Sequence, residues 1–304
     1  MLETILICCA YLVPVFSLEF LKKDGLMLDL PVSRIAVITG SNKGIGYEIA
    51  KKFGTDENTL CILTARNEEY GLRACEQLLQ EGANVVYKNL NIDDEASVET
   101  FTAQMTEEYG KIDVLVNNAA IAFKAADPTP FQQQAEPTVR VNFWGTVRVC
   151  DALMPLIRRS SAGRVVNVSS TSGRLDIFRR DSALRAQFES EALTRDQLYS
   201  LMDHFVASVQ GGTHQRDGWP STCYGMSKLG LTAFTKILAR EEAEANSGVL
   251  VNACHPGYCV TDMTSRKGSR TAEHGARTPF FLGTLPDGSS STGGFWYDCE
   301  EIEW

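Results

Sequence analysis

The sequence predicts an α/β fold in which helices cover both faces of one doubly wound parallel sheet. Short apolar runs alternate with helical segments along most of the 304-residue chain, and the connections between them are short. The first run, residues 35–38, is apolar and rich in β-branched residues, as expected for a strand buried on both faces. A glycine-rich turn and a helix over 47–53 follow it. These features favour a single domain, because one α/β sheet commonly reaches this length.

The further elements follow in a regular order. Strands are predicted at 60–64, from 84–87 onward, and at 114–117, 164–169 and 249–253. The segments between them are predicted to hold helices at 72–79, 97–109, 139–157 and 224–245. Around 285–291 the chain is rich in turn residues, so we expect a loop there.

Three glycines, Gly40, Gly44 and Gly46, lie between the first strand and the first helix. A strand, a glycine turn and a helix N-terminus leave backbone N–H groups pointing at open space, with the helix dipole behind them. This arrangement suits a pyrophosphate, although the spacing Gly-x-x-x-Gly-x-Gly differs from the Gly-x-Gly-x-x-Gly fingerprint. A turn without a ligand is the alternative, and the α/β context favours a nucleotide.

Two basic residues indicate which dinucleotide is bound. NAD-binding proteins place an acidic residue about 20 positions after the glycines, where it bonds the ribose 2′-hydroxyl. Here that position is Arg66, and Lys43 lies inside the glycine turn. Cations at both places would neutralise a 2′-phosphate, so we expect NADPH as the cofactor. The alternative is two solvated surface charges.

Charge and cysteine usage argue against several classes of protein. The net charge of -9 argues against nucleic acid as a partner, because binding its phosphates needs concentrated Lys and Arg. The nine cysteines are scattered, without a CxxC pair or a zinc spacing. We therefore expect no metal site, and reduced thiols in a cytoplasmic enzyme.

Residues 1–30 form a leader of different character. Its apolar block, 5–16, spans only 12 residues and contains Pro14, whereas a membrane-spanning helix needs roughly 20. A signal peptide has this length, but no basic residue precedes the block and no clear cleavage site follows it. A loosely packed leader and a targeting segment both stay open, and we expect no membrane partner unless the leader is retained as an anchor.

The candidate catalytic groups lie further along the chain. Tyr224 and Lys228, four residues apart at the start of a predicted helix, project from one helix face. A lysine ammonium beside a tyrosine favours the phenolate and lowers a pKa that is ordinarily about 10. Ser169 and Ser170 end the fifth strand, at the carboxyl edge where ligands bind in such sheets. A serine hydroxyl there can donate to a carbonyl oxygen that gains negative charge.

Taken in order, these motifs resemble the short-chain dehydrogenase/reductase family, and within it the NADPH-dependent carbonyl reductases. The resemblance covers 34–304 and implies a Rossmann-type sheet. The motifs that carry it are Thr39-Gly-Ser-Asn-Lys-Gly-Ile-Gly46, Asn117-Asn-Ala-Ala120, Val141-Asn-Phe-Trp-Gly-Thr146, Val166-Asn-Val-Ser-Ser170, Tyr224-Gly-Met-Ser-Lys228 and His255-Pro-Gly-Tyr258.

The resemblance implies roles for individual residues. Tyr224 is the expected general acid, and Ser170 polarises the carbonyl. Lys228 binds the nicotinamide ribose and lowers the pKa of Tyr224, while Asn142 holds a water that relays protons to Lys228. Substrate is expected to meet Ser170, Tyr224 and Tyr258. The other expected cofactor-binding residues are Gly40, Asn42, Lys43, Gly44, Ile45, Gly46, Arg66, Asn91, Asn118, Pro256, Gly257, Val260 and Thr261.

An insertion at about 171–221 separates Ser170 from Tyr224, which are much closer together in most of the family. Residues 194–197 read as a capping box, and an apolar stripe at helical spacing occupies 198–209. Monomeric carbonyl reductases resemble this chain in having such an insertion. Because the stripe is available to cover the long helices through which other members associate, we expect a monomer.

Four residues depart from the family pattern. Ala120 stands where glycine is usual, Asn91 replaces an aspartate that contacts the adenine, and Tyr70 replaces a second arginine. His255 follows Cys254 where relatives can have a second cysteine. The first three concern cofactor affinity, and none is one of the expected catalytic groups.

The resemblance implies an NADPH-dependent oxidoreductase that reduces aldehydes, ketones or quinones to alcohols. A steroid or retinoid alcohol dehydrogenase of the same family, running in the opposite direction, is one alternative. A dinucleotide-binding sensor without turnover is the other. The reductase domain is expected over 31–304. Residues 1–26 are expected to be dispensable, because Met27 lies where relatives begin.

Overall fold

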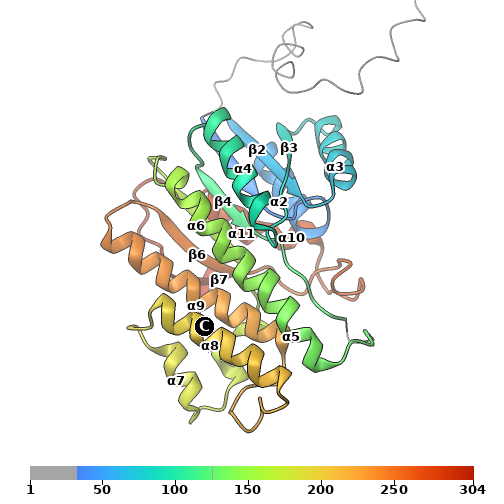
Figure 1. Ribbon diagram of the computed structural model, residues 1–304. Coiled ribbons are helices and arrows are strands. Elements are labelled where there is room, and N and C mark those ends of the chain that lie inside the picture. Colours follow the sequence, from blue (N-terminus) through green and yellow to red (C-terminus); the bar gives the residue numbers. More distant parts are fainter. Residues whose placement is uncertain (1–32, 125) are drawn as a thin grey trace, which may run out of the picture. The chain divides into compact units, whose positions relative to one another are not determined.

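The computed structural model describes residues 33–124 and 126–304 (Figure 1). The expectations for the leader concern residues outside this part of the chain. Among the helices of the described residues, none combines the length and the hydropathy that a membrane span requires. The seven cysteines in the same residues are free thiols, as the sequence predicts.

The described residues form one sheet of eight strands in the order β3-β2-β1-β4-β5-β6-β7-β8. Neighbouring strands are parallel except in the last pair, β7 and β8. Strand order reverses between β1 and β4, which creates the crevice at the carboxyl edge where such sheets bind ligands. The strand bounds are β1 Arg34–Ile38, β2 Thr59–Ala65, β3 Val85–Asn89, β4 Val114–Asn117, β5 Arg164–Val168, β6 Leu250–His255, β7 Phe295–Tyr297 and β8 Glu300–Ile302.

Helices cover both faces of this sheet, and strand alternation decides which core each residue joins. In β1, Ile35 and Val37 face the core formed with α4, α6, α8 and α9, while Ala36 and Ile38 face the core formed with α2, α3 and α11. Figure 1 shows α4, α6 and α9 side by side on one face. The helix bounds are α2 Gly44–Gly54, α3 Glu68–Gln80, α4 Glu95–Glu108, α5 Phe131–Val139, α6 Gly145–Ile157, α7 Ala183–Glu189, α8 Arg195–Gln210, α9 Cys223–Glu244, α10 Ala272–Gly275 and α11 Arg277–Gly283.

The helix predicted at 139–157 differs most from expectation. It is preceded by α5, which starts at Phe131, and is interrupted by a π-helical turn, η1 Arg140–Trp144. Within η1 the backbone N–H of Gly145 bonds to the carbonyl of Arg140, five residues earlier. Pro137 in α5 has no N–H to donate, so the helix is already weakened one turn before η1. The prediction of one regular helix was therefore wrong here.

The insertion forms α7 and α8, and α8 lies against α5 and α9. The capping box at its start is present: the Thr194 hydroxyl accepts from the backbone of Gln197, whose side chain accepts from the backbone of Thr194. Its apolar stripe is buried as predicted, except that Val206 is only partly covered. At Gly230 of α9, an added Cβ would come within 2.6 Å of Met202 Sδ, so the two helices pack as closely as a glycine permits.

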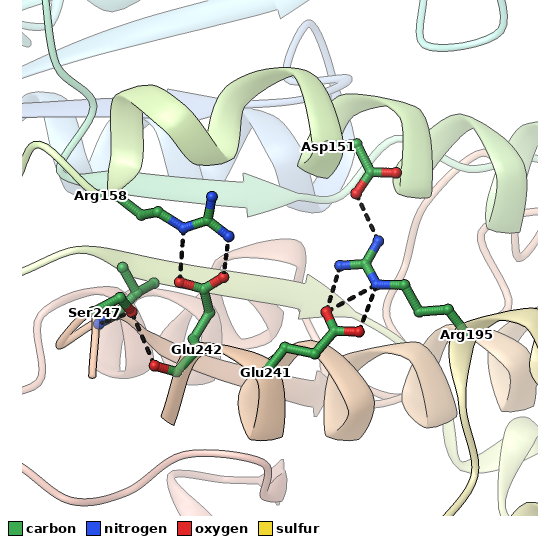
Figure 2. A network of polar contacts seen from close by, with 7 residues as sticks. Asp151, Arg158, Arg195, Glu241, Glu242 and Ser247 are labelled. Carbon is green, nitrogen blue, oxygen red and sulfur yellow. Dashed lines mark hydrogen bonds and ion pairs between the residues drawn. The ribbon is translucent and has the colours of Figure 1, made fainter. Parts of the chain in front are cut away.

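Ion pairs fix α8 on its neighbours (Figure 2). Arg195, in the first turn of α8, donates to Asp151 of α6 at 2.7 Å and to Glu241 of α9 at 2.8 Å. Arg158 at the end of α6 forms a bidentate pair with Glu242, whose side chain is fully buried. Arg195 thus holds the insertion by charge in addition to its apolar stripe, while the Arg158 pair joins α6 to α9.

Candidate active site

The glycine turn leaves the N-terminus of α2 open at the carboxyl edge of the sheet. Gly40 and Gly44 have φ of 63° and 60°, a region that favours glycine. At Gly46 an added Cβ would lie 2.4 Å from Asn118 Nδ2, so only hydrogen fits. Lys43 precedes α2 and caps it with no side-chain hydrogen bond, which leaves the first N–H groups for a ligand. These residues fit a pyrophosphate.

Asn118 joins the glycine turn to the end of β4. Its Nδ2 donates to the carbonyls of Thr39 at 3.0 Å and Gly40 at 3.1 Å. Its backbone N–H, and that of Ala119, bond to the Thr39 hydroxyl at 2.9 and 3.0 Å. The predicted cofactor residue Asn118 therefore also fixes the turn that it adjoins.

The residues predicted to be catalytic lie together. Ser170 comes just after the carboxyl end of β5, and Tyr224 and Lys228 lie in the first two turns of α9. Lys228 is buried and donates from Nζ to the carbonyl of Val168 at 2.8 Å. The same Nζ lies 5.7 Å from the ring centre of Tyr224. Ser170 follows β5, and its side chain lies near enough to Tyr224 to lower the pKa of the phenol. The structure brings all three together.

Strand alternation distinguishes the two serines that end β5. Ser169 points into the protein, where its hydroxyl donates to the carbonyl of Lys228 at 3.0 Å and lies 2.7 Å from the Thr232 hydroxyl. Ser170 points to the opposite side, as successive residues of an extended chain do. Ser170 is therefore available to a substrate, while Ser169 ties β5 to α9.

Burial, rather than charge, sets the protonation of this pair. Burial raises the pKa of Tyr224 to about 12, and the neighbouring Ser170 side chain opposes this only in part. Burial lowers the pKa of Lys228 to about 8. The pKa of Tyr224 is therefore raised by burial, and Lys228 does not lower it as expected. Tyr224 therefore keeps its proton at neutral pH.

Asn142 lies in the π-helical turn η1 and is fully buried. Its Oδ1 accepts from the backbone N–H of Ile121 at 2.8 Å, and its Nδ2 donates to the carbonyl of Ile121 at 2.9 Å. Nδ2 also lies 3.0 Å from the Ser227 hydroxyl, one residue before Lys228. Asn142 thus links the segment after β4 to α9 next to Lys228.

The two cations expected at the 2′-phosphate differ in their surroundings. Lys43 donates to Asp262 at 2.9 Å, and both side chains are more than half exposed. Arg66 is exposed at the end of β2. A third cation, Arg73, lines the same shallow hollow as Lys43, although it also pairs with Glu69. Sequence reasoning missed Arg73, which the helical spacing from Tyr70 could have indicated. The hollow is lined by Asn42, Lys43, Gly44, Tyr47, Tyr70, Arg73, Ala74 and Gln77.

The remaining predicted cofactor residues lie around this crevice. Asn91 follows β3, and its Oδ1 accepts from the backbone of Asp93 at 3.3 Å. The loop after β6 starts at Pro256 and reaches the glycine turn, since a Cβ on Gly44 would lie 3.5 Å from Thr261. Gly257 there has φ of 87°. Ile45 is half-buried in the first turn of α2. Tyr258 and Val260 of the loop are exposed apolar side chains.

Comparisons with known proteins agree with this geometry. The family model described as short chain dehydrogenase matches residues 34–181 and 205–272. Carbonyl reductase (NADPH) 1 of Bos taurus is 42% identical over 89% of this chain and 98% of its own length. Carbonyl reductase (NADPH) 3 of Rattus norvegicus is 44% identical over 84% and 92%. Among solved structures, salutaridine reductase of Papaver somniferum has a TM-score of 0.78 and 29% identity, covering 88% of this chain and all of that one.

Proposed function

The chain belongs to the short-chain dehydrogenase family, and from this membership we propose an NADPH-dependent reductase that converts carbonyl compounds to alcohols. The observation that carries the proposal is the convergence of Ser170, Tyr224 and Lys228 beside an open helix N-terminus. The relatives named above, carbonyl reductases (NADPH) at 42 and 44% identity, support the same cofactor and substrate class.

The glycine turn and the N-terminus of α2 would hold the pyrophosphate, with Asn118 beside the turn. Arg66 and Lys43 would meet the 2′-phosphate, and Arg73 adds a third positive charge in the same hollow. The loop from Pro256 would cover the nicotinamide. When bound, NADPH supplies the hydride.

Tyr224 gives its proton to the substrate oxygen as the alcohol forms. A raised pKa suits this direction of reaction, because the group must carry a proton at neutral pH before it can donate one. The Ser170 hydroxyl donates to the same oxygen and stabilises its developing charge. Lys228 stays cationic below its pKa of about 8, and its ammonium is the proton source from which Tyr224 would be reprotonated.

An NADPH-oxidation screen tests the proposal, with quinones, aromatic aldehydes, ketones and steroids as substrates. Tyr224→Phe should lower kcat at least ~100-fold while NADPH still binds. Tyr109→Phe is the matched control, since Tyr109 ends α4, away from the catalytic residues. A near-normal kcat in Tyr224→Phe would exclude Tyr224 as the general acid. If the unaltered protein turned over none of these carbonyl compounds, the proposed function would be excluded.

We also infer a monomer that works in the cytosol. Helix α8 covers α5 and α9 and is fixed by Arg195, which supports the monomer. The free thiols of the described residues suit a reducing compartment. The family model starts at residue 34, which supports a reductase domain over 31–304 and residues 1–26 as dispensable for activity.

A further inference from the structure

The indole of Trp304 is tied to the segment that carries Ser170. Its Nε1 donates to the carbonyl of Gly173 at 3.0 Å. The ring also lies 5.8 Å from Nζ of Lys236 and packs against the main core, half-buried. Trp304 lies just after β8, which runs antiparallel to β7, so the backbone there heads away from the carboxyl edge and it is the indole that reaches the segment after β5.

Gly173 cannot move away from α9 without breaking a very close contact. An added Cβ at Gly173 would lie 2.5 Å from the backbone nitrogen of Leu229 and 2.6 Å from the carbonyl carbon of Lys228. The short 3-10 turn η2, Thr171–Gly173, therefore rests directly on the backbone of the catalytic lysine. The hydrogen bond from the indole of Trp304 to the carbonyl of Gly173 is a second restraint on this turn.

Ser170 belongs to the same turn. Its carbonyl accepts from the backbone N–H of Gly173 at 2.9 Å, and its hydroxyl accepts from the backbone N–H of Ser172 at 3.1 Å. The orientation of the Ser170 side chain is consequently set by where η2 lies. Without the bond to Trp304, the carbonyl of Gly173 loses the partner that fixes it.

We propose that Trp304 is a positioning residue, which holds η2 against α9 so that Ser170 and Lys228 keep their places around Tyr224. The inference rests on the proposed carbonyl reduction. It concerns kcat rather than cofactor affinity, because the hydrogen bond of the indole ends at the turn that follows Ser170 and not at the glycine turn.

Trp304→Phe tests this by removing the N–H donor while keeping an aromatic ring over Lys236. Trp296→Phe is the matched control: it lies in the same hairpin, and its indole donates to Asn252 at 3.2 Å, within the sheet. Loss of one neutral hydrogen bond predicts a fall in kcat of about fivefold for Trp304→Phe. The Kd for NADPH, measured by fluorescence, should stay unchanged, and Trp296→Phe should lower thermal stability with little change in kcat.

A double-mutant cycle with Ser170→Ala separates positioning from general weakening. If Trp304 acts through the serine, Trp304→Phe should change kcat little further once Ser170 is alanine. Lys236→Met, which keeps the indole hydrogen bond, should leave kcat unchanged. Equal kcat losses in Trp304→Phe and Trp296→Phe, or fully additive losses with Ser170→Ala, would overturn the inference. Absence of carbonyl turnover in the unaltered protein would instead overturn the proposed function.

Discussion

Replacing Arg66 tests how the protein selects NADPH. Arg66 is exposed, and among the ion pairs of the described residues none includes it, so its charge is available to a 2′-phosphate. A charge-assisted hydrogen bond of this kind accounts for roughly 10- to 100-fold in affinity. Arg66→Asp also adds repulsion, so the preference for NADPH over NADH should fall by at least about 100-fold.

Lys43 should matter less, although it lies inside the glycine turn. The ammonium of Lys43 already pairs with the Asp262 carboxylate at 2.9 Å. Exchanging that exposed partner for a 2′-phosphate should add little to the affinity for NADPH. Lys43→Met should therefore change the preference by about fivefold or less. Asp262→Asn is the matched control, because it frees Lys43 and should raise the preference for NADPH slightly.

The assay compares kcat/KM for NADPH and NADH in each variant with one carbonyl substrate. The expected order of effects is Arg66→Asp well above Lys43→Met, with Asp262→Asn in the opposite direction. A larger effect at Lys43 than at Arg66, or an unchanged ratio in Arg66→Asp, would refute the reasoning and place recognition of the 2′-phosphate elsewhere, with Arg73 the next candidate in the hollow.

Further predictions concern protonation, assembly and the leader. The kcat for reduction should fall as pH rises through about 8, because burial lowers the pKa of Lys228 to that value while Tyr224, with its pKa raised to about 12, stays protonated; a flat profile between neutral pH and the titration of Tyr224 would contradict this. Light scattering at micromolar concentration should show a monomer, and a stable tetramer would exclude the covering role of α8. Arg195→Glu, which faces two carboxylates in Figure 2, should lower the melting temperature and favour self-association, whereas unchanged stability would show the ion pairs to be unimportant. A protein beginning at Met27 should keep the turnover of the full chain, and loss of activity would show that the leader is needed.

The sequence predicts the sheet well because each buried strand has its own local signal. The runs that begin at Arg34, Thr59 and Val114 are largely apolar on both faces. A strand needs this pattern when helices cover both faces of its sheet. The hairpin of β7 and β8 is only three residues to a strand and follows a turn-rich loop. Its pairing depends on the edge of β6, which no local pattern encodes.

The proximity of Ser170, Tyr224 and Lys228 was also predictable, since residue type and order single them out as one candidate site. Their electrostatics were not, because the pKa of Tyr224 depends on how much water the folded chain excludes. The pairing of Lys43 with Asp262 brings together positions 219 apart in sequence. Trp304 and Gly173 are 131 apart, so their hydrogen bond is equally invisible until the fold is known.

The π-helical turn at Asn142 sets stability and activity against each other. Deleting one residue from 140–144 would restore regular helical bonding with little rotation of the flanking segments, because a π-helical turn absorbs one extra residue, but it would shift the backbone at Asn142. Asn142 would then leave the backbone of Ile121, and the link to α9 next to Lys228 would be lost. Regular helical bonding in this turn is thus exchanged for the hydrogen bonds that Asn142 makes to Ile121 and Ser227.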